Sequence, residues 1–179
     1  MDKRLLRWEI IGIIVIIFAG SALHFVFELS GRFTPVALIA AVNESTWEHL
    51  KLAFWPALIF ALIEYRYVKA LAPNFWPAKT VALWLTPILI IVIFYGYHWL
   101  TGSGSLVADI SNFIISIIIG QLVGLKLLIK TSPKPGTKIL AWVGLGIITA
   151  AFCLLTFFPP KVFLFQDPIS QGYGIITEK

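Results

Sequence analysis

The sequence predicts an all-α polytopic membrane bundle. It forms one transmembrane domain over residues 1–179, with about five membrane-spanning helices and one short helix that does not cross. Composition is the first reason, because 59% of the 179 residues are hydrophobic and only 13% are charged, whereas soluble domains are about half apolar and a quarter charged. The second reason is a series of long apolar runs, and the third is a bias in where the basic residues fall.

The apolar residues form five runs of about 20 residues, the length that an α-helix needs to cross roughly 30 Å of hydrocarbon. Within hydrocarbon the backbone must satisfy its own hydrogen bonds, so each run is expected to be helical. The first run follows a basic segment, as a signal peptide does, but it continues beyond the small residues at 19–21 and is expected to be retained. The runs are Ile10–Leu29, Leu50–Val68, Val81–Leu100, Leu106–Leu128 and Ile139–Phe158.

A sixth apolar segment, Pro35–Val42, is too short to cross, since its length as a helix is only ~12 Å. Pro35 at its start and Asn43 after its end are typical of a short interfacial helix. A re-entrant half-helix, as in transporters, is the alternative, because non-spanning backbone at membrane depth must be covered by protein or water.

The orientation follows from the basic residues of the short connections. Ten of the 14 lysines and arginines precede the first run or lie in the second and fourth connections, and four lie on the opposite side. By the positive-inside rule, the N-terminus is expected in the cytoplasm and the C-terminus outside. The net charge of +5 is therefore explained by topology, and nucleic-acid binding is not expected. The single cysteine, Cys153, excludes an intrachain disulfide and a thiolate-rich metal site.

On this topology the ionisable residues gather in one layer at the outer ends of the helices. All three histidines and four of the nine acidic residues fall there. Ionisable groups at membrane depth are costly unless they are paired, bound to a metal or exposed to a water-filled cavity, so this layer is the candidate functional site. Its members are His24, Glu28, Asn43, Glu44, Glu48, His49, Tyr95, His98, Asp109 and Asn112.

Ordinary structural roles explain part of this layer. Ser45-Thr46-Trp47-Glu48 fits a capping box, in which the first and fourth side chains satisfy backbone N–H groups at a helix start. Asp109 falls in the first turn of its helix, where a carboxylate interacts favourably with the helix dipole. Neither role explains why all three histidines lie at one level.

The first functional hypothesis is a metal site, with His24, His49 and His98 as ligands of a divalent ion such as Zn²⁺. Glu48 or Asp109 would be the catalytic base or the fourth ligand, supporting metal-assisted hydrolysis of a lipid or other amphiphile. Substrate contacts would come from the remaining polar residues of the layer. These are Glu28, Asn43, Glu44, Tyr95 and Asn112.

Two alternatives stay open, and the sequence does not decide whether the protein is an enzyme. One is a substrate-binding or transport protein for a small cation, an amine or protons, in which half-helix termini and carboxylates hold the ligand. The other is a scaffold subunit whose outer layer binds another protein. The Gly120-x-x-x-Gly124 motif permits close helix contact within one chain or between chains, so oligomerisation is compatible with the sequence.

The string Asn43-Glu44-Ser45-Thr46-Trp47-Glu48-His49-Leu50-Lys51 resembles a family of small multi-pass prokaryotic membrane proteins classed as a domain of unknown function. The segment from Gln166 to Gly174 resembles that family less closely. The resemblance implies a prokaryotic inner-membrane protein surrounded by lipid, and it implies nothing about chemistry.

Overall fold

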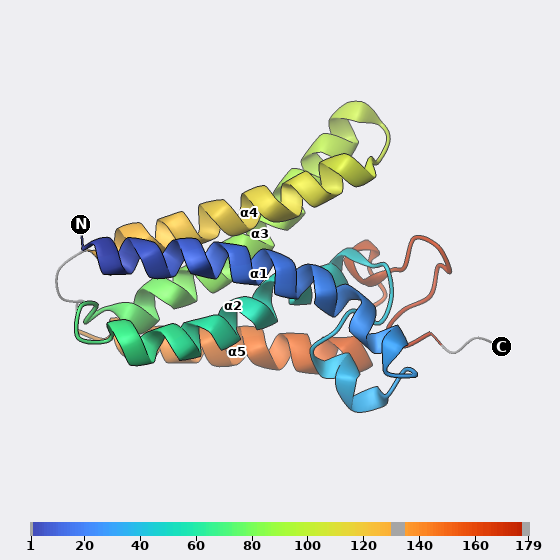
Figure 1. Cartoon of the computed structure of the whole chain (residues 1–179). Coiled ribbons are helices and arrows are strands. Elements are labelled where there is room, and N and C mark those ends of the chain that lie inside the picture. Colours follow the sequence, from blue (N-terminus) through green and yellow to red (C-terminus); the bar gives the residue numbers. More distant parts are fainter. Residues whose placement is uncertain (1, 130–134, 177–179) are drawn as a thin grey trace.

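The computed structural model describes residues 2–129 and 135–176, which form five long α-helices and two short 3₁₀-helices (Figure 1). The helices run up and down through the bundle. We call the end at which the first helix begins the inner end, and the opposite end the outer end, following the expected orientation. The elements are α1 (Lys3–Leu29), η1 (Thr34–Leu38), α2 (Thr46–Val68), α3 (Phe75–Thr101), α4 (Leu106–Leu128), α5 (Thr137–Phe157) and η2 (Phe163–Phe165).

The all-α class and the five helices are confirmed, and four of the helices are long and apolar enough to cross a membrane: α1, α3, α4 and α5. Helix α2 is not among the four, and it carries Glu48, Lys51, Glu64 and Arg66. It nevertheless lies alongside α1 in the bundle (Figure 1). That α2 also crosses the membrane stays a prediction.

Helix α2 tolerates these charges because the other helices cover it. It packs against α1, α3 and η2, and Leu50, Phe54 and Phe60 enter the main core cluster. The same cluster contains Ile16 of α1 and Phe152 of α5. Charged side chains on a covered helix are removed from lipid, so their partners must come from the neighbouring helices.

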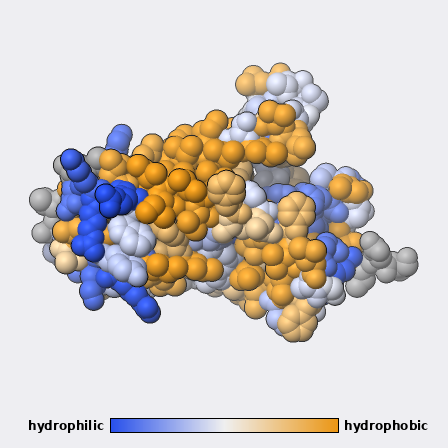
Figure 2. Space-filling model, in the orientation of Figure 1, coloured by the Kyte–Doolittle hydropathy of each residue, from blue (hydrophilic) through white to orange (hydrophobic). Residues whose placement is uncertain are grey.

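The surface along the sides of the bundle is largely apolar and forms a belt (Figure 2). The inner end of the bundle is hydrophilic. Several large apolar side chains are exposed on it, among them Phe18, Val92 and Leu140. Soluble monomers rarely expose contiguous apolar patches of this extent. This apolar belt is therefore expected of a protein that is partly surrounded by lipid.

Helices α3 and α4 form a closely packed hairpin through the predicted glycine motif. A Cβ added at Gly120 would lie 2.0 Å from Thr86 Oγ1, and one at Gly124 would lie 3.2 Å from Ala82 Cβ. Small residues on both helices therefore allow close approach of the backbones. At the outer end this hairpin diverges from the rest of the bundle (Figure 1).

The segment after α1 stays at the outer end, as a piece too short to cross. Only Thr34–Leu38 is helical, in 3₁₀ form, so the helix ends earlier than the predicted Val42. Ala37, Ala40 and Val42 pack with Phe27 in a small core cluster. This packing fixes the chain that leads into the first turn of α2.

The C-terminal tail folds back onto the same loop. Asn43 Nδ2 donates to the Gly174 carbonyl at 2.8 Å, and the backbone N–H of Glu44 donates to the Asp167 carboxylate. The two strings that resemble the family are thus in contact, although more than 100 residues separate them.

Candidate metal site

Three metal-ligating side chains meet at the outer end of the bundle: His24 from α1, Glu44 from the loop after η1, and His49 from the first turns of α2. Their ligand atoms all lie within 4.8 Å of one another. Glu44 Oε1 is 3.8 Å from His24 Nε2, and Glu44 Oε2 is 3.4 Å from His49 Nε2. Among the described residues this is the one group of three or more such side chains that is close enough to hold an ion.

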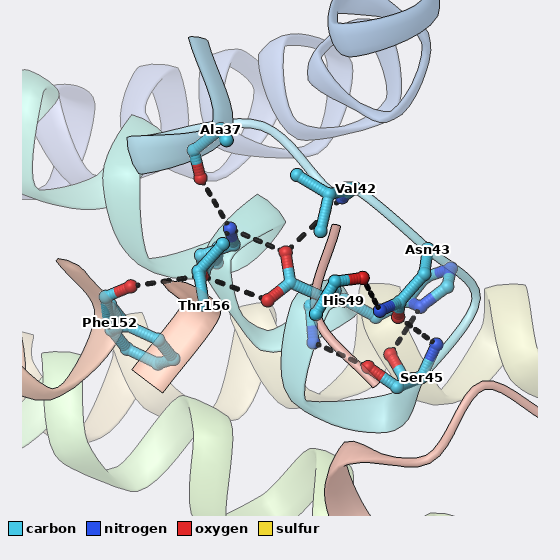
Figure 3. Close-up of polar contacts among 10 residues, drawn as sticks. Ala37, Val42, Asn43, Ser45, His49, Phe152 and Thr156 are labelled. Atoms are coloured by element: carbon cyan, nitrogen blue, oxygen red, sulfur yellow. Dashed lines mark hydrogen bonds and ion pairs between the residues drawn. The ribbon is translucent and has the colours of Figure 1, made fainter. Parts of the chain in front are cut away.

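The local sequence orients His49. Ser45 is the N-cap of α2, and its backbone N–H donates to Asn43 Oδ1 at 2.8 Å. The Ser45 carbonyl in turn lies 2.9 Å from His49 Nδ1 (Figure 3). A carbonyl can only accept, so His49 Nδ1 carries a proton, and Nε2 is the ring nitrogen that faces Glu44. A backbone carbonyl on the far nitrogen is the usual second partner of a metal-ligating histidine.

The site is open to solvent. The side chains of His24, Glu44 and His49 are 29%, 44% and 34% exposed. The two imidazole rings lie 5.1 Å apart between centroids, and Phe25 contacts the His24 ring edge-on. An ion from solution can reach these ligands, and a further coordination position would remain free.

Glu48 does not belong to this group. Its carboxylate is buried and forms an ion pair with Lys51, with Glu48 Oε2 2.5 Å from Lys51 Nζ. Glu48 Oε2 also accepts from the Val42 backbone N–H, and Glu48 Oε1 accepts from the Thr156 hydroxyl at 2.9 Å (Figure 3). Its predicted role as catalytic base is therefore not supported by its position, because every oxygen is already engaged. Half of the predicted capping box is present, since the Glu48 N–H donates to Ser45 Oγ, but the Ser45 N–H donates to Asn43 Oδ1 instead of to Glu48.

Sequence reasoning missed the importance of Lys51, which it counted only among the four basic residues of the outer side. Lys51 is fully buried. Besides Glu48, its ammonium donates to the Ala37 carbonyl at 2.8 Å and to Thr156 Oγ1 at 2.9 Å. The i, i+3 spacing of Glu48 and Lys51 on one helix face was the available signal.

His98 is the main correction to the predicted ligand set, because the structure does not bring it to His24 and His49. It lies near the tip of the diverging α3–α4 hairpin, where His98 Nδ1 bonds to the Phe94 carbonyl at 2.9 Å. Its Nε2 atom faces Gly104. His98 lies in the last turn of α3, in the part of the hairpin that diverges from the rest of the bundle (Figure 1). Glu44, predicted as a substrate contact, is the third member of the group that could hold an ion.

Three other predicted residues lie on this hairpin, and none of them belongs to the group of His24, Glu44 and His49. The Asp109 carboxylate accepts from the Tyr97 hydroxyl. Asn112 is buried and donates to the Ile90 carbonyl at 3.0 Å. Tyr95 lies closer to α2, with its hydroxyl 3.0 Å from Thr46 Oγ1. Asp109 is therefore not placed to activate a water on an ion held by His24 and His49.

The remaining two predicted substrate residues lie at the outer loop. Glu28 is exposed and pairs with Arg32 at 3.7 Å. Asn43 bonds to the tail and to the Ser45 N–H, so it shapes the loop that presents Glu44. Its amide is occupied by the protein itself.

A second buried ionic cluster lies at the inner end, and the sequence did not indicate it. Lys79 Nζ is 2.5 Å from Glu9 Oε1 and 2.7 Å from Glu64 Oε2, and Gln121 Oε1 is 3.5 Å away. Each of the four residues comes from a different helix, and all four are buried. Glu9 and Glu64 lie near the ends of apolar runs, where the sequence alone suggests contact with water. Helix α1 begins at Lys3, well before the run at Ile10, so Glu9 lies inside the bundle, and Glu64 falls within the run Leu50–Val68 itself.

The chain matches the family of unknown function DUF6512 over residues 2–175. The chain belongs to this family. The resemblance found in Asn43–Lys51 is thereby confirmed, over nearly the whole chain. Searches of curated proteins and of solved structures found no similar protein.

Proposed function

We propose that this DUF6512 protein is a multi-pass membrane protein that binds a divalent transition metal at its outer end through His24, Glu44 and His49. The observation that carries the proposal is the convergence of three ligand atoms within 4.8 Å from three separate segments of the chain. The positive-inside bias, with an N-terminus in the cytoplasm, would place this site on the external side of a prokaryotic cell membrane.

The separations of the ligand atoms approach those of a tetrahedral ion. With bonds of about 2.0–2.1 Å, two ligands of tetrahedral Zn²⁺ lie about 3.3 Å apart. The 3.4 Å from Glu44 Oε2 to His49 Nε2 meets this value, and the 3.8 Å from Glu44 Oε1 to His24 Nε2 is close to it. These are different oxygens of one carboxylate, and the three single ligand atoms lie within 4.8 Å of one another, so the exposed side chains must close by up to about 1.5 Å to hold one tetrahedral ion. Two imidazoles and a carboxylate are ligands that Zn²⁺ accepts readily.

Three protein ligands leave a coordination position for water or substrate, as in catalytic zinc sites. A bound ion there would polarise a carbonyl or phosphoryl oxygen, or would lower the pKa of a bound water. The exposed apolar side chains of Phe25 and Phe33 favour an amphiphilic substrate at the membrane surface. Metal-assisted hydrolysis of a lipid or similar amphiphile is the reaction that we infer for this site.

The test is metal binding by the purified protein. Elemental analysis after a chelator-free preparation, followed by calorimetric titration of the chelated protein with Zn²⁺, is expected to show one ion per chain. His24→Ala, His49→Ala and Glu44→Gln should each weaken binding by at least about 100-fold, since even loss of a supporting residue costs 10–100-fold.

The third histidine provides the matched control. His98→Ala is expected to leave the stoichiometry and affinity for Zn²⁺ unchanged, because His98 lies on the diverging hairpin. Failure of the wild-type protein to bind Zn²⁺ would overturn the proposal. So would equal losses in the His98 variant and in the three ligand variants.

A further inference from the structure

The inner ionic cluster contains more negative than positive charge. Glu9 of α1 and Glu64 of α2 are 1% and 0% exposed, and both face the single ammonium of Lys79, which is 2% exposed. With both acids ionised, the cluster carries a net charge of −1 in the interior of the bundle. An uncompensated buried charge costs several kcal/mol, so such a state calls for another positive charge or a proton.

The packed helices supply no second cation. Among the described residues, no other charged group is ion-paired with this cluster. The nearest basic residues along α1, α2 and α4 are Arg7, Arg66 and Lys126, and all three are exposed. The remaining neighbours are uncharged: Gln121 from α4 lies 3.5 Å from Lys79 Nζ, and the Phe75 ring of α3 lies 5.6 Å from it. Tyr65 of α2 packs on Phe75 and Trp76.

The carboxylate oxygens point independently to a missing hydrogen. Glu9 Oε2 and Glu64 Oε1 are buried, and no described residue donates a hydrogen bond to either of them. Glu64 Oε2 lies close to the ammonium but outside hydrogen-bond geometry. Ionised carboxylates can only accept, whereas a protonated carboxyl can donate as well. One added proton would both neutralise the cluster and supply a donor among these oxygens.

We propose that Glu9 and Glu64 share one proton at neutral pH, so that the cluster is a proton-binding site in the inner half of the bundle. Lys79 is the fixed cation of this site, and the neutral state is one ammonium, one carboxylate and one carboxylic acid. Uptake and release of this proton would change the buried charge by one unit. Protonatable groups of this kind inside helical bundles are the usual carriers of protons in membrane proteins.

Infrared spectroscopy of the detergent-solubilised protein tests the proposal directly. The wild-type protein at neutral pH is expected to show the carbonyl stretch of a buried protonated carboxyl group, and the band should be lost reversibly as the pH is raised. Glu9→Gln and Glu64→Gln should each abolish the band, because either substitution leaves one carboxylate matched to Lys79. Loss in both variants is the signature of a shared proton.

Glu28→Gln is the matched control, since Glu28 is an exposed glutamate paired only at the surface, and this variant should keep the band. The wild-type spectrum is decisive even if a variant fails to fold. Absence of the band at neutral pH would overturn the proposal, and so would its survival in both folded glutamine variants. Lys79→Met, which removes the fixed cation, is expected to increase the band, because both acids then need a proton.

Discussion

Two buried glutamate–lysine networks lie near opposite ends of α2, and they differ in whether their charges and hydrogen bonds are balanced. At the outer end one glutamate meets one lysine, and both carboxylate oxygens of Glu48 accept hydrogen bonds. At the inner end two glutamates meet one lysine, and buried oxygens of Glu9 and Glu64 have no donor among the described residues. The same residue types therefore have different consequences.

The balanced network has a structural role. Lys51 and Glu48 connect α2 to the Ala37 carbonyl, to the Val42 backbone N–H and to Thr156 of α5. These contacts fix the segment that precedes α2, and that segment presents Glu44 to the two histidines. The inner network joins side chains of four helices and does not position a loop. Its excess charge is what makes it a candidate for proton binding.

The largest effect is expected from breaking the balanced network with Lys51→Met. This substitution leaves Glu48 as a buried carboxylate without its cation, and it leaves the Ala37 carbonyl without its donor. Removal of one partner of a buried ion pair costs about 3–5 kcal/mol. Thermal unfolding in detergent should show a large fall in the midpoint.

Lys69→Met is a suitable control, because Lys69 is an exposed lysine at the other end of the same helix. It should unfold as the wild-type protein does. If Lys51→Met is as stable as this control, then the outer network does not hold the loop and the contrast between the two ends of α2 is wrong.

The next largest effect is the difference in stability loss between Glu→Gln substitutions in the two networks. Glu48→Gln leaves the Lys51 ammonium buried beside a neutral amide and should lower stability by about 2–4 kcal/mol. Glu64→Gln leaves a matched Glu9–Lys79 pair and should change stability by less than about 1 kcal/mol, because one of the two acids is already neutral in our proposal. Thermal unfolding of both variants at the same neutral pH measures this difference. Equal losses would mean that both glutamates at the inner end are ionised.

The fold was largely predictable, because membrane helices are determined by long apolar runs that sequence displays directly. The run Leu106–Leu128 coincides with α4. The least accurate boundaries were those at the inner ends, where α1 begins at Lys3 and α3 at Phe75, before the runs at Ile10 and Val81. A polar residue ends an apolar run in the sequence, but the helix itself can continue through that residue where other helices cover its side chain.

The site was only partly predictable for a related reason. Position within a run gives the depth of a residue along the bundle, and His24, Glu44 and His49 were placed correctly in one layer. Depth gives no lateral position, so His98 was grouped with them although its hairpin diverges (Figure 1). The partners of buried charges are equally hidden, since Glu9 and Lys79 are 70 residues apart.

The smallest effect is expected at Asp167, where the tail reaches the same outer loop without a buried ion pair. Burial of this carboxylate would raise its pKa, but hydrogen bonds from the Ser170 hydroxyl and from the backbone N–H groups of Ile169, Ser170 and Glu44 hold the pKa below the ordinary aspartate value. Because its pKa is lowered in the folded state, the ionised carboxylate stabilises the fold at any pH above the ordinary aspartate pKa. This contribution is lost as the pH falls through the folded-state value.

Asp167→Asn should therefore lower stability by about 1 kcal/mol near neutral pH, because an amide replaces a charged acceptor of several bonds. The difference from wild type should shrink as the solution is made acidic, until both proteins carry a neutral side chain. Unfolding midpoints across this pH series, with Glu28→Gln as the exposed control, measure the effect. A loss as large as that of Lys51→Met would show that the tail, rather than the Glu48–Lys51 pair, holds the loop that presents Glu44. A difference that persists unchanged in acid would show that the Asp167 contribution does not come from its charge.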